Sequence, residues 1–420
     1  MVINPESTNE KMLSNFMLIS IFIDEWNIFS VTMLSIFLSS YFHFTTIDTG
    51  LIIGATTGGA AIGSLIGGIL TDKFGRKRIF FLNMSIFIIA SILSIFSPTI
   101  IFFIIARFIT GLPTGSDISN TYSYIMELFK PGKREVIGTK NTLMASYAIL
   151  GINITIIMLL LLHVAYHLIW TMTLGFPVLP AIMLIIYSKK LEESKLWEDY
   201  SEKEHAYTGF IKSLKKDRVK WHTTVYAWVC GIASGIEIGT FAFFIPYIIS
   251  LLHLSGIVYS RLIIILVYSI GIPAGYLGPK LIPRLGLKRI SYSGFSMSFI
   301  ALIFSGLFLV MKLFIFVPVF MLLFVWGNHW NNQPIITSQA VVSNTDYRGK
   351  ATGFTNFILQ LPAFLSITIF PVLFSIIGIG YSTIVISMAS LSGIIISKTV
   401  FKEIYGYSGD IRSETVNVQH

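Results

Sequence analysis

The sequence predicts an all-α polytopic membrane protein. Hydrophobic residue types make up 54% of its 420 residues and charged types only 12%, with a mean hydropathy of +0.75. A water-soluble protein carries about twice that charged fraction. Apolar stretches of about 20 residues, the length of a bilayer-spanning helix, recur along nearly the whole chain. The ~10-residue alternating segments typical of a transmembrane β-barrel are absent from the sequence.

Twelve spans are expected, six on each side of the one long charged segment. The expected organisation is a cytoplasmic N-terminus at 1–15, a six-helix bundle at 16–188, a cytoplasmic linker at 189–220, a second six-helix bundle at 221–400 and a cytoplasmic tail at 401–420. The expected spans are 16–41, 49–70, 79–97, 100–127, 137–162, 166–188, 221–251, 258–282, 290–310, 313–343, 352–375 and 378–398.

Basic residues predict the orientation in the membrane. With these spans, 27 of the 30 Lys and Arg residues fall on one side, while Arg261 and Lys312 fall on the other and Arg107 lies within a span. Because basic residues gather in cytoplasmic loops, both termini and the linker are expected in the cytoplasm of a cell-membrane protein. Topology then explains the net charge of +9, and no nucleic-acid partner is expected.

The two halves of the chain echo one another. DKFGRKRI at 72–79 recurs as PRLGLKRI at 283–290, a shift of 211 residues, and KREVIGTKN at 133–141 has a looser echo in RGKATGFTN at 348–356. Two similar six-helix halves are typical of secondary transporters whose substrate site lies between the halves at mid-membrane.

The segment GGILTDKFGRKRIF, 67–80, is a dense cluster of charge between two apolar runs. Gly67 and Gly68 allow a close approach to a neighbouring helix, and Gly75 allows a tight turn. Asp72 can accept hydrogen bonds from a helix N-terminus or pair with a nearby Arg, so that it holds one closed arrangement.

This segment resembles the signature of the major facilitator superfamily, G-x-L-x-D-R-x-G-R-[KR]-[RK]. The matching residues are Gly68, Leu70, Asp72, Gly75, Arg76, Lys77 and Arg78, whereas Lys73 replaces the usual Arg. The resemblance implies that this motif governs the switch between inward and outward states, and Glu127 and Arg134 are expected to belong to the same gate. Pro283 replaces the acid in the second copy, so the second half is expected to lack this latch.

Further stretches resemble branches of that superfamily. ARFITGLPTGSD at 106–117 is similar to the fourth-helix pattern of sugar porters and metabolite–proton symporters, and SGIE at 234–237 is similar to the sugar-porter S-G-I-N. DEWNIFSV at 24–31 resembles helix 1 of phosphate and aromatic-acid proton symporters, and NHWNNQP at 328–334 resembles helix 10 of phosphate permeases. These resemblances imply proton-coupled transport of a small polar metabolite such as a sugar, an organic acid anion or phosphate.

Ionisable side chains within spans are the candidate proton-coupling residues, because each costs roughly 2.5–3.5 kcal/mol to insert. Asp117 is the leading candidate, since a carboxyl in a low dielectric binds a proton more readily, and it is expected to face a central cavity. Glu237, in the other half, is the second. Asp24 and Glu25 point about 100° apart on a helix, so one of them faces the cavity, and the motif favours Asp24. The alternative places both acids near a water-filled mouth.

Polar side chains in spans are the candidate substrate ligands. Arg107 can hold an anion, or alternatively form a structural ion pair with a carboxylate such as Asp24. The other candidates, for which helix–helix hydrogen bonding is the alternative, are Asn328, Asn332, Gln333, Trp26, Asn141 and Gln360.

The sequence therefore predicts a monomeric proton symporter that works by alternating access. A facilitative uniporter and a nutrient sensor that has lost transport remain alternatives. No nucleophile–base constellation, cofactor motif or metal-ligand cluster is present, so neither an enzyme nor a bound cofactor or metal is expected.

Overall fold

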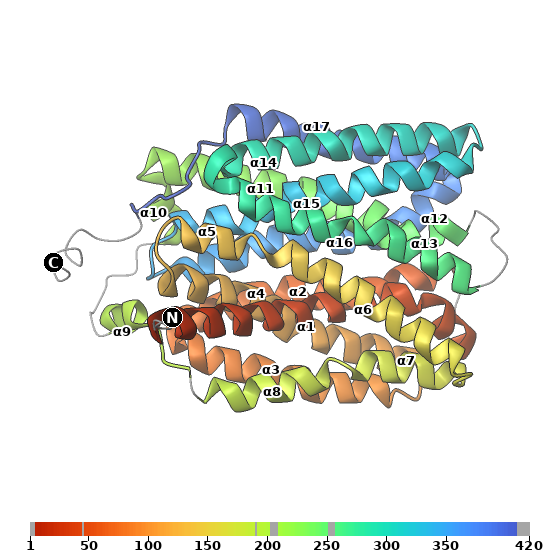
Figure 1. The fold of residues 1–420 in the computed structure, drawn as a ribbon, viewed down its shortest axis with the longest axis horizontal. Coiled ribbons are helices and arrows are strands. Elements are labelled where there is room, and N and C mark those ends of the chain that lie inside the picture. The colour runs from red at the N-terminus through yellow and green to blue at the C-terminus, as the bar shows by residue number, and fades with distance from the viewer. Residues whose placement is uncertain (1–4, 44–45, 190, 202–208, 251–256, 410–420) are drawn as a thin grey trace.

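The computed structural model describes residues 5–43, 46–189, 191–201, 209–250 and 257–409. Long helices lie side by side along the molecule (Figure 1). The helices of the first half and of the connection that follows it are α1 (Pro5–Phe42), α2 (Thr46–Phe74), α3 (Arg76–Ile95), α4 (Ile100–Leu128), α5 (Lys133–Gly138), α6 (Asn141–Leu161), α7 (Tyr166–Gly175), α8 (Val178–Ser188), α9 (Lys195–Ser201) and α10 (Phe210–Lys215).

The second half begins where Asp217 caps α11 by accepting hydrogen bonds from the N–H groups of Val219 and Lys220. Its helices are α11 (Arg218–Glu237), the π-helical η1 (Ile238–Ala242), α12 (Phe243–Ser250), α13 (Ile257–Ser269), α14 (Gly271–Val310), the 3₁₀-helical η2 (Phe314–Phe316), α15 (Val317–Val342), α16 (Arg348–Ile377) and α17 (Ile379–Thr399).

The chain crosses the bilayer twelve times, as predicted. Eleven segments within the described residues are long and apolar enough to span a membrane, and the longest, Ile257–Val310, has 54 residues. Gly286 interrupts this segment with a φ of 78° and a ψ of 164°, which is not helical. The parts on either side, 257–285 and 287–310, each exceed the ~20 residues that a crossing needs. They form the eighth and ninth spans.

Small residues bring α2 and α4 into close contact. A Cβ atom added at Gly63 of α2 would collide with the backbone of Leu112, and one added at Gly115 of α4 would collide with the backbone of Ala60. Larger side chains would hold the two helices apart, so the glycines let their backbones touch, as small residues do in membrane helix pairs. Gly67, which the sequence assigned to such packing, lies against Ser116.

The internal repeat extends to the turn between the second and third spans of each half. Gly75 and Gly286 both adopt positive φ values, of 93° and 78°. After each glycine, a glutamate carboxylate accepts hydrogen bonds from the next two backbone N–H groups: Glu193 in the first half and Glu403 in the second. These turns lie at the end of the molecule that carries α9 and α10, which we call the linker end (left in Figure 1).

Candidate functional site

A cavity lies between the two halves. Helices α1, α4 and α6 line it from the first half, and η1, α12, α13, α15 and α16 line it from the second. The space open to the centres of water molecules is about 80 Å³. One water needs about 10–15 Å³ of such space, so the cavity has room for several waters or one small polar solute. Phe29 stacks on Phe243 across the halves in the cavity wall, with ring centroids 4.9 Å apart.

Helical periodicity decides which side chains reach the cavity. On α1, Ile21, Glu25 and Ile28 follow one another at spacings of four and three residues and share the face that lines the cavity. On α15, Asn328 and Asn332 do the same from the second half. The expectation that Asp24 rather than Glu25 faces the cavity is wrong, because the face of α1 that carries Asp24 packs into its own bundle.

Four of the candidate substrate ligands lie where that role requires. Asn141 of α6, Asn328 and Asn332 of α15, and Gln360 of α16 all line the cavity. They come from both halves, so a solute between them would touch both.

Arg107 does not line the cavity. Its Nε atom donates to Thr56 Oγ1 (3.1 Å) and its Nη2 atom donates to the backbone oxygen of Asn27 (2.5 Å), and the side chain is 1% exposed. The alternative ion pair with Asp24 is also not formed. In this conformation Arg107 bonds the α1 backbone to α2 within the first half, and its predicted contact with substrate is not formed by the cavity lining.

Trp26 and Gln333, also predicted as substrate ligands, lie outside the cavity lining in this conformation. The Trp26 indole N–H donates to the backbone oxygen of Thr173 (2.9 Å), and its ring stacks on Phe176. Gln333 donates from Nε2 to Thr142 Oγ1 (3.0 Å). Both side chains serve helix contacts, because their positions on α1 and α15 point away from the cavity.

The lining includes polar residues that sequence reasoning missed, among them Glu25, Asn356 and His329. The repeat contained a signal for Asn356, since it occupies the position of Asn141 in the echoed segment. The sequence analysis assigned no role in substrate binding to His329. Its Nδ1 atom is hydrogen-bonded to the Val325 backbone oxygen (2.7 Å), and its Nε2 atom is hydrogen-bonded to a serine of α6 (2.6 Å).

Two carboxyl groups meet behind the cavity wall. Asp24 of α1 and Asp117 of α4 are 1% and 0% exposed, and their side chains lie close to each other. Asp117 accepts hydrogen bonds from Ser20 and from Thr121 (3.3 Å), whereas neither oxygen of Asp24 has a hydrogen-bond donor among the described residues. Two adjacent carboxylates in a low dielectric cannot both ionise, so the pair holds at least one proton.

The expectation that Asp117 faces the central cavity is wrong. On α4 the cavity is lined by Ile118 and Tyr122, while Asp117 and Thr121 lie on the face that packs against α1. Neither Asp24 nor Asp117 is therefore part of the described cavity lining. The residue that follows each of them is: Glu25 after Asp24, and Ile118 after Asp117.

Glu237 holds a second buried acidic position, at the end of α11. Its carboxylate accepts hydrogen bonds from Ser390 Oγ (2.5 Å), Asn331 Nδ2 (2.8 Å) and Asn328 Nδ2 (3.2 Å). Asn328 also lines the cavity, so a single amide joins Glu237 to the space between the halves.

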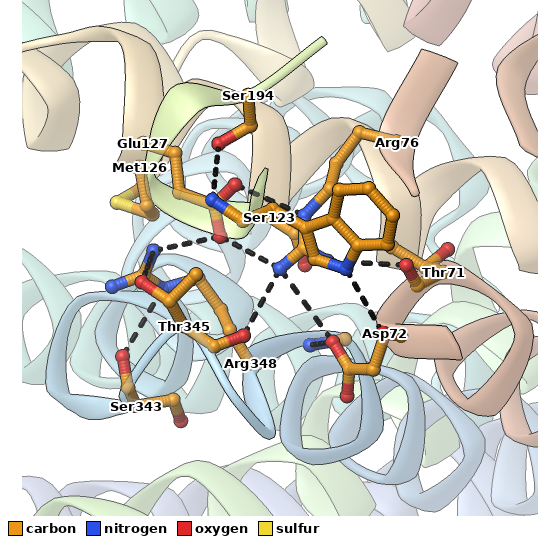
Figure 2. Close-up of polar contacts among 12 residues, drawn as sticks. Thr71, Asp72, Arg76, Ser123, Met126, Glu127, Ser194, Ser343, Thr345 and Arg348 are labelled. Atoms are coloured by element: carbon orange, nitrogen blue, oxygen red, sulfur yellow. Dashed lines mark hydrogen bonds and ion pairs between the residues drawn. The ribbon is translucent and has the colours of Figure 1, made fainter. Parts of the chain in front are cut away.

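At the linker end a charged latch joins the halves (Figure 2). Glu127, at the end of α4, bonds Arg76 of α3 through two hydrogen bonds (2.7 and 2.9 Å) and Arg348 of α16 through one (3.1 Å). All three side chains are at most 1% exposed. Arg76 also donates to the backbone oxygen of Thr345 (3.1 Å), which strengthens the connection to the second half.

Asp72 adds a second contact between the halves (Figure 2). Its two oxygens accept hydrogen bonds from the backbone N–H groups of Gly349 and Lys350, each at 2.9 Å, in the first turn of α16. A carboxylate is stabilised there because the first N–H groups of a helix have no partner within it and carry partial positive charge. Gly68 packs against Gly349 at the same contact. Asp72 lies where the gating motif requires.

The remaining gate candidates bond elsewhere at the linker end. Arg134 donates to the backbone oxygens of Met126 (3.2 Å) and Tyr407 (2.7 Å). Lys77 takes part through its backbone N–H, which bonds Glu193 after the Gly75 turn.

The second half has no matching charged latch. Pro283 stands at the repeat position of Asp72, and Leu287 stands at that of Arg76. The Glu403 contact is retained, but these two positions cannot form ion pairs. The latch is therefore asymmetric.

Two six-helix halves, a polar cavity between them and a latch that bridges them at one end define a secondary transporter. The chain belongs to the Major Facilitator Superfamily, whose family model matches residues 16–367.

Curated relatives of this chain are transport proteins. It is 25% identical over 410 residues to the probable metabolite transport protein CsbC of Bacillus subtilis (strain 168), with 85% of this chain and 83% of the relative covered. It is 29% identical over 167 residues to the arabinose-proton symporter of the same organism, with 38% of this chain and 35% of the relative covered. Among solved structures, the proton:xylose symporter XylE bound to 6-bromo-6-deoxy-D-glucose aligns with a TM-score of 0.79 and 15% identity, covering 94% of this chain and 96% of that one. The last comparison supports the fold.

Proposed function

We propose that this protein is a proton-coupled symporter of a small polar solute of about the size of a sugar. The observation that carries this proposal is the close approach of two buried acids, Asp24 and Asp117, which do not both ionise in a low dielectric. Relatives that are named as arabinose-proton symporter and D-xylose transporter support the same class of activity.

The position of the pair suggests how a proton and a solute are linked. Helix α4 carries Asp117 in the membrane and Glu127 in the latch, so the proton site and the gate share one rigid element. Helix α1 carries Asp24 on one face and Glu25 in the cavity. Loss of the proton would leave two adjacent negative charges without counterions, and their repulsion would separate α1 from α4. Such a movement would change the shape of the cavity and, at the same time, displace Glu127 of the latch.

The energy available is sufficient for uphill transport. One positive charge that crosses a membrane at about 100 mV releases about 2.3 kcal/mol. This corresponds to roughly 40-fold accumulation of the solute, since about 1.4 kcal/mol is a factor of ten.

In this account the linker end faces the cytoplasm of the cell membrane, where basic residues gather. Lys77, Lys133 and Lys288 all lie at that end. The halves, 16–188 and 221–400, would rock against each other about the central cavity, and the latch would hold the cytoplasmic end closed.

Among the solutes that the sequence leaves open, the cavity favours uncharged or cationic ones over organic acids and phosphate. Its described lining contains Glu25 but neither Lys nor Arg, so an anion would find no counterion there. Arg107, the one base expected to bind an anion, is engaged within the first half.

Uptake into proteoliposomes under an imposed proton gradient tests the proposed function. A screen of sugars, carboxylates and phosphate for thermal stabilisation at two pH values first identifies a bound solute. A symporter accumulates that solute only while the gradient lasts. Equal uptake with the gradient collapsed by an ionophore would show a uniporter and overturn the proposal.

A further inference from the structure

The central cavity contains one carboxyl side chain, and its described lining includes His329 but neither lysine nor arginine. Glu25 is partly buried and lines the cavity from the middle of α1. Its carboxylate forms neither a hydrogen bond nor an ion pair with any described residue. A buried charge without a partner is costly, so a group that enters the cavity and pairs with this carboxylate is stabilised there.

Two buried arginines of the fold, Arg107 and Arg261, have partners outside the cavity. Arg107 is bonded within the first half, as described above. Arg261 of α13 donates to Asn153 Oδ1 (3.3 Å) and lies over the ring of Phe37, 5.7 Å from its centroid. Neither arginine lines the cavity, so neither neutralises Glu25.

Amides are the main uncharged polar groups of the lining. Asn356 donates from Nδ2 to Ser64 (2.7 Å), and Asn328 donates from Nδ2 to Glu237 (3.2 Å). Asn332 and Gln360 also line the cavity, and an amide offers both donors and acceptors to a solute. The amides therefore suit a hydroxylated solute, whereas the charge preference of the cavity comes from Glu25.

Aromatic rings complete the lining. Phe29, Phe243, Phe324, Tyr122 and Tyr268 all contribute to the cavity wall. The negative faces of such rings attract cations.

We propose that the cavity binds a cationic solute, one that carries an ammonium group beside hydroxyl groups, and that the Glu25 carboxylate binds the ammonium. An ammonium group has three donors and one positive charge, which match the unpaired carboxylate and the aromatic wall. This inference rests on the proposed transport function and specifies its substrate class as an amine-bearing, sugar-sized solute.

Two matched series of solutes test the inference: glucose, glucosamine and gluconate, and galactose, galactosamine and galactonate. Thermal stabilisation of the purified protein and solute exchange in proteoliposomes without a gradient are measured at pH 6, where the amines are charged. The amine is expected to act at a concentration at least about tenfold lower than its neutral partner, as for a hydrogen bond to a charged group. The acid is expected to have no effect.

Variants assign the preference to Glu25. Glu25→Gln keeps the size of the side chain and removes its charge, so the ratio between amine and neutral sugar should fall to about one. Glu25→Asp keeps the charge and should retain a preference for the amine. Glu192→Gln, which removes an exposed carboxylate outside the cavity, should leave the ratio as in the unmodified protein.

Three results would overturn the inference: no effect of either amine, equal or better binding of a neutral or acidic member, or an amine preference that survives in Glu25→Gln. Proton-driven uptake of a neutral sugar with no amine preference would refute this inference and leave the proposed function intact. Amine uptake that is equal with and without a proton gradient would refute the proton coupling and leave the inference intact.

Discussion

Arg348 lies 3.1 Å from the Glu127 carboxylate, and this contact joins the second half of the molecule to the first at the linker end. Because Arg76 binds the same carboxylate at 2.7 Å, helices α3, α4 and α16 meet at one buried acid. Alternating access requires this end to open, so the contact has to break in every transport cycle. It must therefore stabilise the closed state without making it permanent.

Glu127→Gln is expected to shift the protein towards states that are open at the linker end. It leaves two buried guanidinium groups without the Glu127 carboxylate, and breaking a buried ion pair costs about 3–5 kcal/mol, or roughly two to four decades in the equilibrium. Distances between spin labels at Lys130→Cys and Asp346→Cys, both exposed, report the opening.

The matched control for the latch is Arg289→Gln, because Arg289 occupies in the second half the repeat position of Arg78. It removes a base at the same end of the molecule outside the latch, so the label distances should not change. A Glu127→Gln variant with the distances of the unmodified protein would show that the latch does not hold the closed state.

Asp117→Asn is expected to abolish accumulation of solute while exchange continues. The amide cannot bind and release the proton that the Asp24–Asp117 contact requires. In the unmodified protein, accumulation should fall as the external pH rises, because the pair must gain its proton from that side. In the variant this dependence should be lost. Full accumulation by Asp117→Asn would eliminate the pair as the coupling site.

Gly115→Ala is expected to destabilise the protein, whereas Gly231→Ala should be neutral or stabilising. The added methyl group collides with the Ala60 backbone in the first case and meets only side-chain atoms at 3.7–3.8 Å in the second. Overpacking costs about 1–3 kcal/mol, while alanine in a helix is favoured over glycine by up to about 1 kcal/mol. Thermal unfolding in detergent measures both, and equal melting temperatures would refute the α2–α4 contact.

Glu193→Gln and Glu403→Gln should have similar effects on stability and different effects on the gate. Each carboxylate accepts hydrogen bonds from two backbone N–H groups after the turn glycine. Capping of this kind stabilises a protein by about 0.5–2 kcal/mol. Only the first positions Arg76, whose side chain binds Glu127. The label distances used for the latch should therefore change in Glu193→Gln alone; an identical response of both variants would contradict the asymmetry of the gate.

The sequence was sufficient to predict the spans and the repeat, because these depend on signals that lie along the chain. Hydrophobic length predicts a crossing, and the motif around Asp72 predicts a helix N-terminus or a nearby Arg as its partner; α16 and Arg76 provide these. The internal repeat also indicates Asn356, because Asn356 occupies in the second half the position that Asn141 has in the first.

The assignment of residues to the cavity could not be made from the same signals. Asp24 and Glu25 are neighbours about 100° apart, and the packing of α1 against the other helices decides which one faces the other half. Arg107 and Gln333 likewise donate hydrogen bonds to residues that are distant in the sequence, Thr56 and Thr142 respectively. Such choices depend on the rotation of each helix, which hydrophobic spans do not specify.

The central claim is that a proton on the Asp24–Asp117 pair moves with the solute. The most direct measurement uses proteoliposomes that contain a pH-sensitive dye and start without any gradient, to which solute is added outside. The account predicts that the interior becomes more acidic as solute enters, and that Asp117→Asn admits solute without acidification. Entry of solute into vesicles of the unmodified protein with no change in internal pH would contradict it, as would undiminished acidification in the variant.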